Sequence, residues 1–202
     1  MDSMRKAFLA DHIEICEILH SSLPRDPILK LIKSLDISKQ YCESLIISND
    51  VYLFVNKKIG VLGIISIGNL AAVIRNLLHS LSFRIKLKFF LSILGYNNIK
   101  SFPFQILLLV TGRYLPSRNE ITWIAVKEEF RSQGIGKSLI SYAAHERLDA
   151  NHEILVKTLS STPENVLFYQ SCGFMIQHTS MGRVILKGDP NQICSVLKMQ
   201  KN

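Results

Sequence analysis

The sequence predicts an α/β (α+β) fold in which a mixed central sheet is flanked by helices. Three observations support this prediction. Apolar residues recur at helical spacing in the first fifty residues, two alternating strands then form a hairpin, and strand and helix patterns alternate from residue 120 onward. The chain has 202 residues, of which 48% are hydrophobic, and this is enough for one substantial core. We therefore expect a single domain over residues 1–202.

Three helices are expected before the hairpin, each beginning at residues that favour a helix N-terminus. They are a helix after Asp11 that ends near Ser21, a stretch opened by Pro24 and Pro27, and a helix from Ser38 to Ile47. The hairpin strands follow at residues 51–56 and 60–67. A helical insertion rich in Leu, Phe, Arg and Lys is expected at about residues 69–100, and a connecting segment without a clear pattern continues to residue 119.

The second half of the chain alternates strands with helices. The expected elements are a strand at 120–126, a helix from about Gly134 to Asp149, a strand at 153–159, a helix at 163–172, and terminal strands near 174–180 and 193–199. Together with the hairpin, this order favours one mixed sheet with helices packed against it.

The loop after the strand at 120–126 has the chemistry of a diphosphate site. Its sequence is Arg131-Ser132-Gln133-Gly134-Ile135-Gly136-Lys137-Ser138. Glycines remove side chains where a backbone must approach a ligand, and the helix that follows begins with unpaired N–H groups and a positive dipole end. A Walker loop would need Gly in place of Arg131, and a dinucleotide fingerprint would need Gly in place of Leu139. An ordinary strand-to-helix turn is the remaining alternative.

A second motif spans Thr162 to Phe174 and has the features of a complete short helix. Thr162 can cap it, Pro163 is favoured at its first position, and Gly173 can adopt the left-handed conformation that ends a helix.

These two motifs, R-x-x-G-x-G after a strand and F-Y-x-x-x-G-F at the end of a helix, resemble those of the GNAT superfamily of N-acetyltransferases. The resemblance implies a mostly antiparallel sheet, acetyl-CoA as co-substrate without a metal, and direct acetyl transfer to the primary amine of a small molecule. The insertion, together with the stretch His20-Ser21-Ser22, resembles a branch associated with surface-polysaccharide pathways, and an amino-sugar conjugate is the hypothesised acceptor. Protein or peptide N-acetylation and a non-catalytic coenzyme A-binding module remain alternatives.

The resemblance also assigns roles to individual residues. Tyr169 matches the tyrosine that protonates the departing thiolate, with core packing as the alternative. Glu120 stands where some protein-acetylating members have a general base, with a solvated strand end as the alternative and water as the other candidate base. Strand alternation predicts that Glu120, Thr122 and Ile124 share a face. The expected cofactor-binding residues are Ile124, Ala125, Val126, Arg131, Ser132, Gln133, Gly134, Ile135, Gly136, Lys137, Ser138, Asn165 and Tyr169.

The composition predicts a cytoplasmic protein. No apolar run approaches the ~20 residues that cross a bilayer. Acidic residues at Asp11 and Glu14 come too early for a signal peptide. The four cysteines are widely spaced, which predicts reduced, mostly buried thiols and no metal site; they are Cys16, Cys42, Cys172 and Cys194.

The formal net charge of +8 is concentrated in one part of the chain. Residues 51–119 contain no acidic residue but nine Lys or Arg. A local surface that attracts anions is therefore a better interpretation than nucleic-acid binding, and it favours an acceptor that carries phosphate. A solvated basic face is the alternative.

The insertion also suggests peripheral membrane contact. Leu77, Leu81, Ile85 and Phe89 recur every four residues beside Arg84 and Lys88. Core packing of that stripe is the alternative. The oligomeric state stays open, and a dimer is compatible with the sequence.

Overall fold

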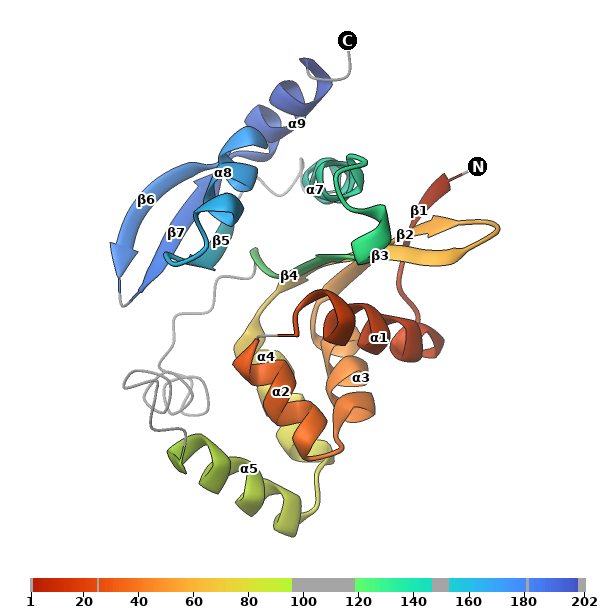
Figure 1. Cartoon of the computed structure of the whole chain (residues 1–202), viewed down its shortest axis with the longest axis vertical. Helices are drawn as coiled ribbons and strands as arrows, with labels where there is room; N and C mark the ends of the chain where they lie inside the picture. The colour runs from red at the N-terminus through yellow and green to blue at the C-terminus, as the bar shows by residue number, and fades with distance from the viewer. Residues whose placement is uncertain (1, 25, 96–118, 147–152, 181, 200–202) are drawn as a thin grey trace.

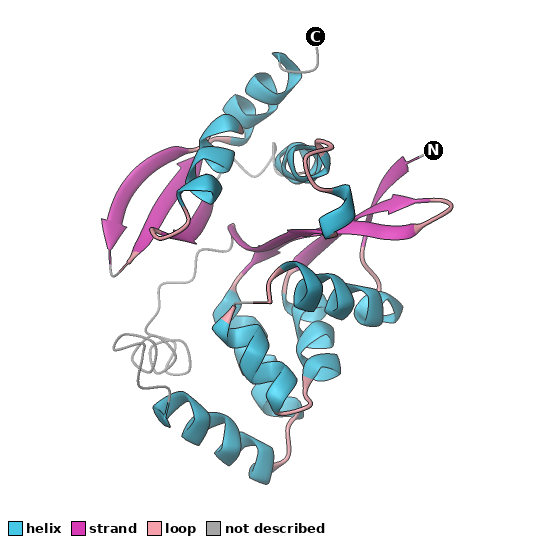
Figure 2. Cartoon of the chain, in the orientation of Figure 1, coloured by secondary structure: helices cyan, strands magenta, loops and turns pink. Residues whose placement is uncertain are grey.

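A computed structural model of the chain describes residues 2–24, 26–95, 119–146, 153–180 and 182–199. Within these ranges the chain forms one sheet with helices on both of its faces (Figures 1 and 2). The predicted α/β (α+β) architecture is therefore confirmed. None of the described helices is both long enough and apolar enough to span a bilayer.

The described strands are β1 (Asp2–Lys6), β2 (Asp50–Asn56), β3 (Gly60–Gly68), β4 (Glu120–Val126), β5 (Ile154–Leu159), β6 (Met175–Ser180) and β7 (Arg183–Gly188). Their order in the sheet is β1-β2-β3-β4-β5-β7-β6. Neighbouring strands are antiparallel except β4 and β5, which are parallel. The expected mixed, mostly antiparallel sheet is thus confirmed.

The described helices are α1 (His12–Ser22), α2 (Pro27–Ser34), α3 (Ser38–Ser48), α4 (Leu70–Ser80), α5 (Phe83–Gly95), α7 (Ile135–His145), α8 (Pro163–Ser171) and α9 (Pro190–Met199), with short 3₁₀ turns η1 (Leu9–Asp11) and η2 (Glu128–Phe130). Figure 1 shows α1 to α5 on one side of the sheet and α7 on the other. The predicted starts of α2 and α3 are confirmed.

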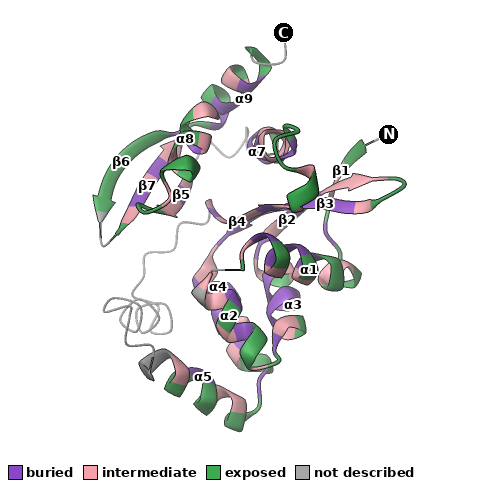
Figure 3. Ribbon diagram, in the orientation of Figure 1, coloured by how far each residue is buried: buried purple, intermediate pink, exposed green. Residues whose placement is uncertain are grey.

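Two hydrophobic clusters hold the helices to the sheet, one on each face (Figure 3). The first joins α1 to α5 with the strands β2 to β4 and includes Ile18 and Tyr41. The second joins α7, α8 and α9 with the sheet and includes Leu139 and Ile193. The central strand β3 is therefore buried on both sides, which explains why it is apolar at nearly every position rather than alternating.

A bulge in β4 changes the facing of its residues. Ser66 of β3 pairs with Trp123 and the next residue pairs with Ile121, so Thr122 is the extra residue. As a result Trp123 packs into the cluster with α1 to α5, whereas Ile121 and Ile124 belong to the cluster with α7. The prediction that Glu120, Thr122 and Ile124 share a face is wrong, because the bulge interrupts the alternation on which it depended.

The last part of the chain differs from the prediction. The expected strand at 193–199 is helix α9, and strand β7 lies earlier, at Arg183–Gly188. Ile193 and Leu197 are four residues apart and both are buried, which is helical spacing. The signal that indicates this helix is the preceding Asp189-Pro190 pair, since Asp189 accepts the N–H of Asn191 at 3.0 Å as a cap. Strand β1 was also not predicted.

The insertion forms two helices instead of one continuous element. α4 ends at Ser80, and Leu81 is extended before α5 begins at Phe83. The predicted connection over residues 96–119 lies, apart from Asn119, outside the described residues. The predicted helix from Gly134 to Asp149 ends at His145 in the structure, and residues 147–152 are likewise outside the described ranges.

Asp11 precedes α1, but its carboxylate does not cap that helix. Instead both of its oxygens accept hydrogen bonds of 2.7 Å from the guanidinium of Arg5 on β1. One oxygen also accepts the backbone N–H of Phe8 at 2.7 Å. The hydrogen bonds from Arg5 hold the pKa of Asp11 below its usual range. This ion pair fastens the first strand to the start of α1.

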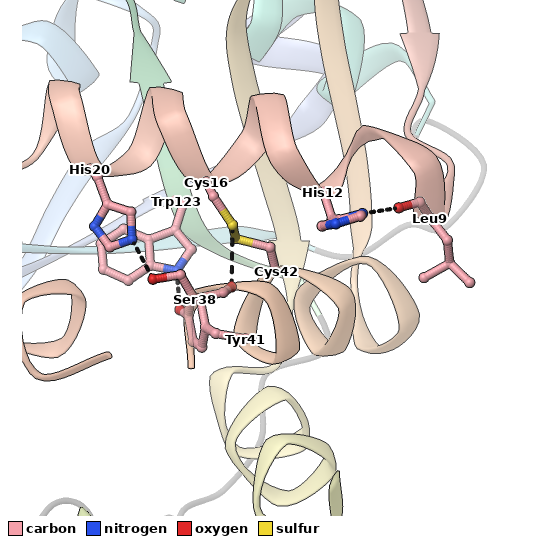
Figure 4. Close-up of a disulfide and its surroundings, with 8 residues drawn as sticks. All are labelled: Leu9, His12, Cys16, His20, Ser38, Tyr41, Cys42 and Trp123. Atoms are coloured by element: carbon pink, nitrogen blue, oxygen red, sulfur yellow. Dashed lines mark hydrogen bonds between the residues drawn. A yellow bond between two sulfur atoms is a disulfide. The ribbon is translucent and has the colours of Figure 1, made fainter. Parts of the chain in front are cut away.

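Cys16 of α1 and Cys42 of α3 form a disulfide (Figure 4). The prediction of reduced thiols is therefore wrong for this pair, whose contact depends on how α1 packs against α3. Cys172 and Cys194 are free. The cytoplasmic location stays a prediction, and the cysteines no longer support it.

We expect the Cys16–Cys42 bond to protect two cysteines from alkylation. Protein denatured without reductant should take up two alkyl groups, at Cys172 and Cys194, and reduced protein should take up four, as counted by mass spectrometry. Because the bond closes a separation of 26 residues, reduction should lower the free energy of unfolding by about 3 kcal/mol in denaturant titrations. Four labels without reductant would contradict the assignment.

Candidate active site

The strands β4 and β5 pair over only two residues and then separate. Glu120 pairs with Leu155 and Ile121 with Val156, whereas β4 continues along β3 to Val126. The N–H of Lys127 donates to the carbonyl of Leu62 in β3 at 2.9 Å. The backbone N–H groups of successive residues in a strand point to opposite edges of that strand. Because the Lys127 N–H points to β3, the N–H groups of Ile124 and Val126 point to the other edge, where β5 no longer pairs with β4.

The loop that follows β4 leads into the N-terminus of α7, which is exposed to solvent. Gly134 has a φ of 80°, and a methyl group added there would meet nothing within 4 Å. The first hydrogen bond of α7 runs from the Ser138 N–H to the Gly134 carbonyl, so the N–H groups of Ile135 and Gly136 have no acceptor within the helix. Residues 131–134 are exposed. Exposed donors at the positive end of a helix are a suitable site for a diphosphate.

Arg131 turns away from this open space. Its guanidinium donates to the carbonyl of Ser22 at 3.0 Å and to the carbonyl of Val126 at 3.3 Å. The Ser22 hydroxyl donates to the same Val126 carbonyl at 2.9 Å. These bonds tie the end of α1 to the end of β4 and hold the loop in place. Ser22 was not predicted, because its partners are about a hundred residues away in the sequence.

Gly136 lies directly under the aromatic ring of Phe168 from α8. A methyl group at Gly136 would lie 3.1 Å from the ring, which is too close without movement of the ring. The second glycine of the motif therefore allows α8 to pack over the first turn of α7. Ile135, between the two glycines, is buried in the core on this side of the sheet.

Tyr169 is buried in the same cluster, on α8. Its ring makes edge-to-face contacts with Phe168 and Phe174, with ring centroids 5.3 and 5.7 Å apart. Burial raises the pKa of the phenol well above its usual value, so the hydroxyl keeps its proton at neutral pH and has one available to donate. Asn165, one turn earlier, is exposed, and its amide donates to the Thr162 hydroxyl at 3.3 Å.

Glu120 forms an ion pair at the point where β4 and β5 separate. Lys157 of β5 donates to its carboxylate at 2.6 Å, and each side chain is only 14% exposed. Glu120 is on the opposite side of β4 from Ile121, which faces α7. The pair thus lies on the face that α1 to α4 cover. Lys157 was not predicted, because its role depends on strand pairing across 37 residues.

A second pair of opposite charges lies near this face. Asp26, in the connection between α1 and α2, caps α2 by accepting the N–H groups of Ile28 and Leu29 at 2.9 and 3.0 Å. Burial raises its pKa, and the positive charge of Arg183 opposes that shift. Arg183 pairs with Leu159 two residues beyond Lys157, so these cations share one face of the sheet. No group of three or more potential metal ligands occurs among the described residues.

Comparisons with known proteins agree with this geometry. Residues 105–176 match the model of the acetyltransferase (GNAT) domain. The chain has the GNAT acetyltransferase fold. No curated protein sequence matches the chain.

Solved structures show the fold over nearly the whole chain. PaiA N-acetyltransferase from Thermoplasma acidophilum, solved with coenzyme A, is 13% identical, with a TM-score of 0.61 over 94% of this chain and 99% of that one. The ribosomal-protein-S18-alanine N-acetyltransferase of Escherichia coli is 11% identical, with a TM-score of 0.53 over 93% of both chains. IAA acetyltransferase from Bacillus cereus is 14% identical, with a TM-score of 0.52 over 94% and 99%. The domain match and the fold support an acyltransferase of the GNAT superfamily, in the 2.3.1 class of enzymes.

The predicted site residues thus fall into three groups. Those on β4 and in the 131–138 loop adjoin one another, and Tyr169 lies beside them on the α7 side of the sheet. Glu120 lies on the other side, next to Lys157. Asn165 stands apart on the exposed start of α8.

We expect alanine at each of the two loop glycines to destabilise the protein for a different reason. Gly136→Ala adds a methyl group 3.1 Å from Phe168 and should destabilise the protein by about 1–3 kcal/mol, with partial recovery when combined with Phe168→Leu. Gly134→Ala meets no neighbour but forces an alanine to a φ of 80°, costing about 1 kcal/mol. Both should weaken coenzyme A binding in calorimetry. Unchanged affinity in both variants would contradict the diphosphate site.

Proposed function

We propose that this protein transfers the acetyl group of acetyl-CoA to the primary amine of a small molecule. The observation that supports this most directly is the open edge of β4, which leads to the exposed N-terminus of α7. The diphosphate would bind the N–H groups after Gly134, and the pantetheine arm would run along Ile124 and Val126. The GNAT domain match and the coenzyme A in the Thermoplasma acidophilum structure support this cofactor.

The reaction is a direct transfer between two bound substrates. The amine nitrogen attacks the thioester carbonyl, the new C–N bond forms, and the C–S bond breaks. The nitrogen must lose a proton, and the departing thiolate must gain one. N–H donors on the β4 edge would stabilise the oxygen that becomes negatively charged during the attack.

Tyr169 is the proposed proton donor. Its raised pKa keeps the phenol protonated, and its place on α8 puts it on the cofactor side of β4. Because the phenol keeps its proton at neutral pH, it can donate that proton to the departing thiolate, and the phenolate that remains must regain a proton before the next turnover.

Glu120 is the proposed base, and it would act from the acceptor side of the sheet. Lys157 holds the carboxylate in position at 2.6 Å and neutralises its charge. As the amine loses its proton to Glu120, the ammonium of Lys157 would keep the protonated carboxyl aligned. Because the acid and the base would be on opposite sides of β4, the proton taken from the amine and the proton given to the thiolate would move on separate sides of the strand.

An amino-sugar conjugate with an anionic group is the proposed acceptor. Charges of both signs lie on this face, in the pair of Glu120 and Lys157 and in Asp26 and Arg183, which suits a conjugate that carries both an amine and a phosphate. The basic block at 51–119 contributes less than its sequence suggested. Its described members are divided among three elements: Lys57 and Lys58 in the β2–β3 turn, Arg75 on α4, and Arg84, Lys86 and Lys88 on α5.

Release of free thiol from acetyl-CoA tests the proposal. Amino sugars, nucleotide-linked amino sugars, polyamines and peptides should be compared as acceptors, and we expect the nucleotide-linked sugars to react fastest, with an advantage that shrinks at high salt. Tyr169→Phe should lower kcat about 100-fold with little change in cofactor affinity. Faster reaction with peptides would favour protein acetylation, and no reaction with any amine would favour a non-catalytic module.

The base can be identified from a pH profile. Glu120→Gln keeps the size of the side chain and an acceptor for Lys157, so the fold should persist. The rate should fall most at neutral pH and least at high pH, where the amine loses its proton without help. Lys39→Gln, on the exposed surface of α3, is a control for an unrelated charge change. An equal loss at every pH would assign Glu120 a positioning role instead.

A further inference from the structure

Helix α5 uses one face to pack against the protein. Phe89 is 1% exposed and belongs to the core cluster on this side of the sheet, and Ile85 packs partly against it. Leu77 and Leu81 are also buried. The apolar stripe that the sequence suggested for a membrane is therefore part of the core, and that interpretation of these four residues is wrong.

The opposite face of α5 is apolar and exposed. Phe83 is 79% exposed, Leu87 49%, Phe90 37% and Leu91 58%. At the rotation of an α-helix these four residues fall within an arc of about 100°. Isolated exposed apolar residues are ordinary, but four large ones along one face form a surface that water solvates poorly.

Basic residues border this apolar face on both sides. The rotation of about 100° per residue places Arg84 and Lys88 along one edge of the apolar face and Lys86 along the other edge. Arg84 and Lys88 are exposed, and Lys86 is half-buried. No acidic residue occurs anywhere in residues 51–119 of the sequence, so nothing within the block neutralises these cations.

We propose that α5 binds to the surface of an anionic lipid bilayer, with its axis in the membrane plane. The apolar face would enter the acyl boundary, and the bordering cations would meet the anionic headgroups. Charge complementarity favours a lipid surface over a second copy of this chain, because two such helices would repel each other. Figure 1 shows α5 beyond α4, on the side of the sheet opposite α7. Binding there leaves the N-terminus of α7 open to a water-borne cofactor.

Co-sedimentation of the whole protein with vesicles tests this proposal without reference to acetyl transfer. The protein should bind vesicles that mix phosphatidylglycerol with phosphatidylcholine, bind pure phosphatidylcholine vesicles far less, and dissociate at high salt. Arg84→Gln with Lys88→Gln should weaken binding about 30-fold. Phe83→Ser with Leu87→Ser should weaken it by at least about tenfold.

Matched control variants distinguish binding through this face of α5 from non-specific electrostatic or hydrophobic adsorption. Lys57→Gln with Lys58→Gln removes the same charge from the exposed β2–β3 turn, and Ile47→Ser removes an apolar side chain that is 65% exposed on α3. Both should bind vesicles like the wild type. The proposal is overturned if the wild type does not bind anionic vesicles, if it binds neutral vesicles as tightly as anionic ones, or if it binds RNA and not anionic vesicles. A large fall in melting temperature for Phe83→Ser with Leu87→Ser would also overturn it, by showing that this face is packed within the protein.

Discussion

The separation of β4 from β5 after two residue pairs is the constraint on which the rest of the site depends. Parallel neighbours normally satisfy each other's backbone groups along their whole length, and here β4 offers polar groups to an edge that no described strand covers beyond Ile121. A ligand with an amide-containing chain can satisfy those groups. The same divergence brings the start of α7 to the end of that edge, because the loop leaves β4 at Val126.

The two strands that flank the opening are packed differently: β4 contributes to both cores, whereas the buried residues of β5 belong only to the cluster on the α7 side. In the cluster with α1 to α5, the indole N–H of Trp123 on β4 donates to the buried Tyr41 hydroxyl at 2.7 Å (Figure 4). β5 is held by the cluster with α8 and α9. Packing at native density resists the movement that closing the strands would require. Ser22 and Arg131 add polar bonds at the Val126 end.

The two faces of the sheet differ in chemical character: one carries a charged pair near the opening, and the other is apolar there. The half-buried pair of Glu120 and Lys157 is on the face of the sheet away from α7, whereas Tyr169 is in the apolar cluster on the α7 side. A carboxylate needs a partner when it leaves water, and a phenol that must stay protonated is favoured by an apolar surrounding. The exposed face of α5 extends the side away from α7 still further from the cofactor loop.

The sequence by itself determined the fold class, the hairpin, the strand β4 and the loop from Arg131 to Ser138, because periodicity, glycines and helix capping act between residues close along the chain. Only the tertiary structure decided what those residues contact. The bulge at Thr122, the bond of Arg131 to Ser22, the packing of Gly136 under Phe168 and the pairing of Glu120 with Lys157 all join distant segments. The same holds for the disulfide between α1 and α3 and for which face of α5 is buried. Such contacts depend on how elements pack, and one sequence contains no local signal for them.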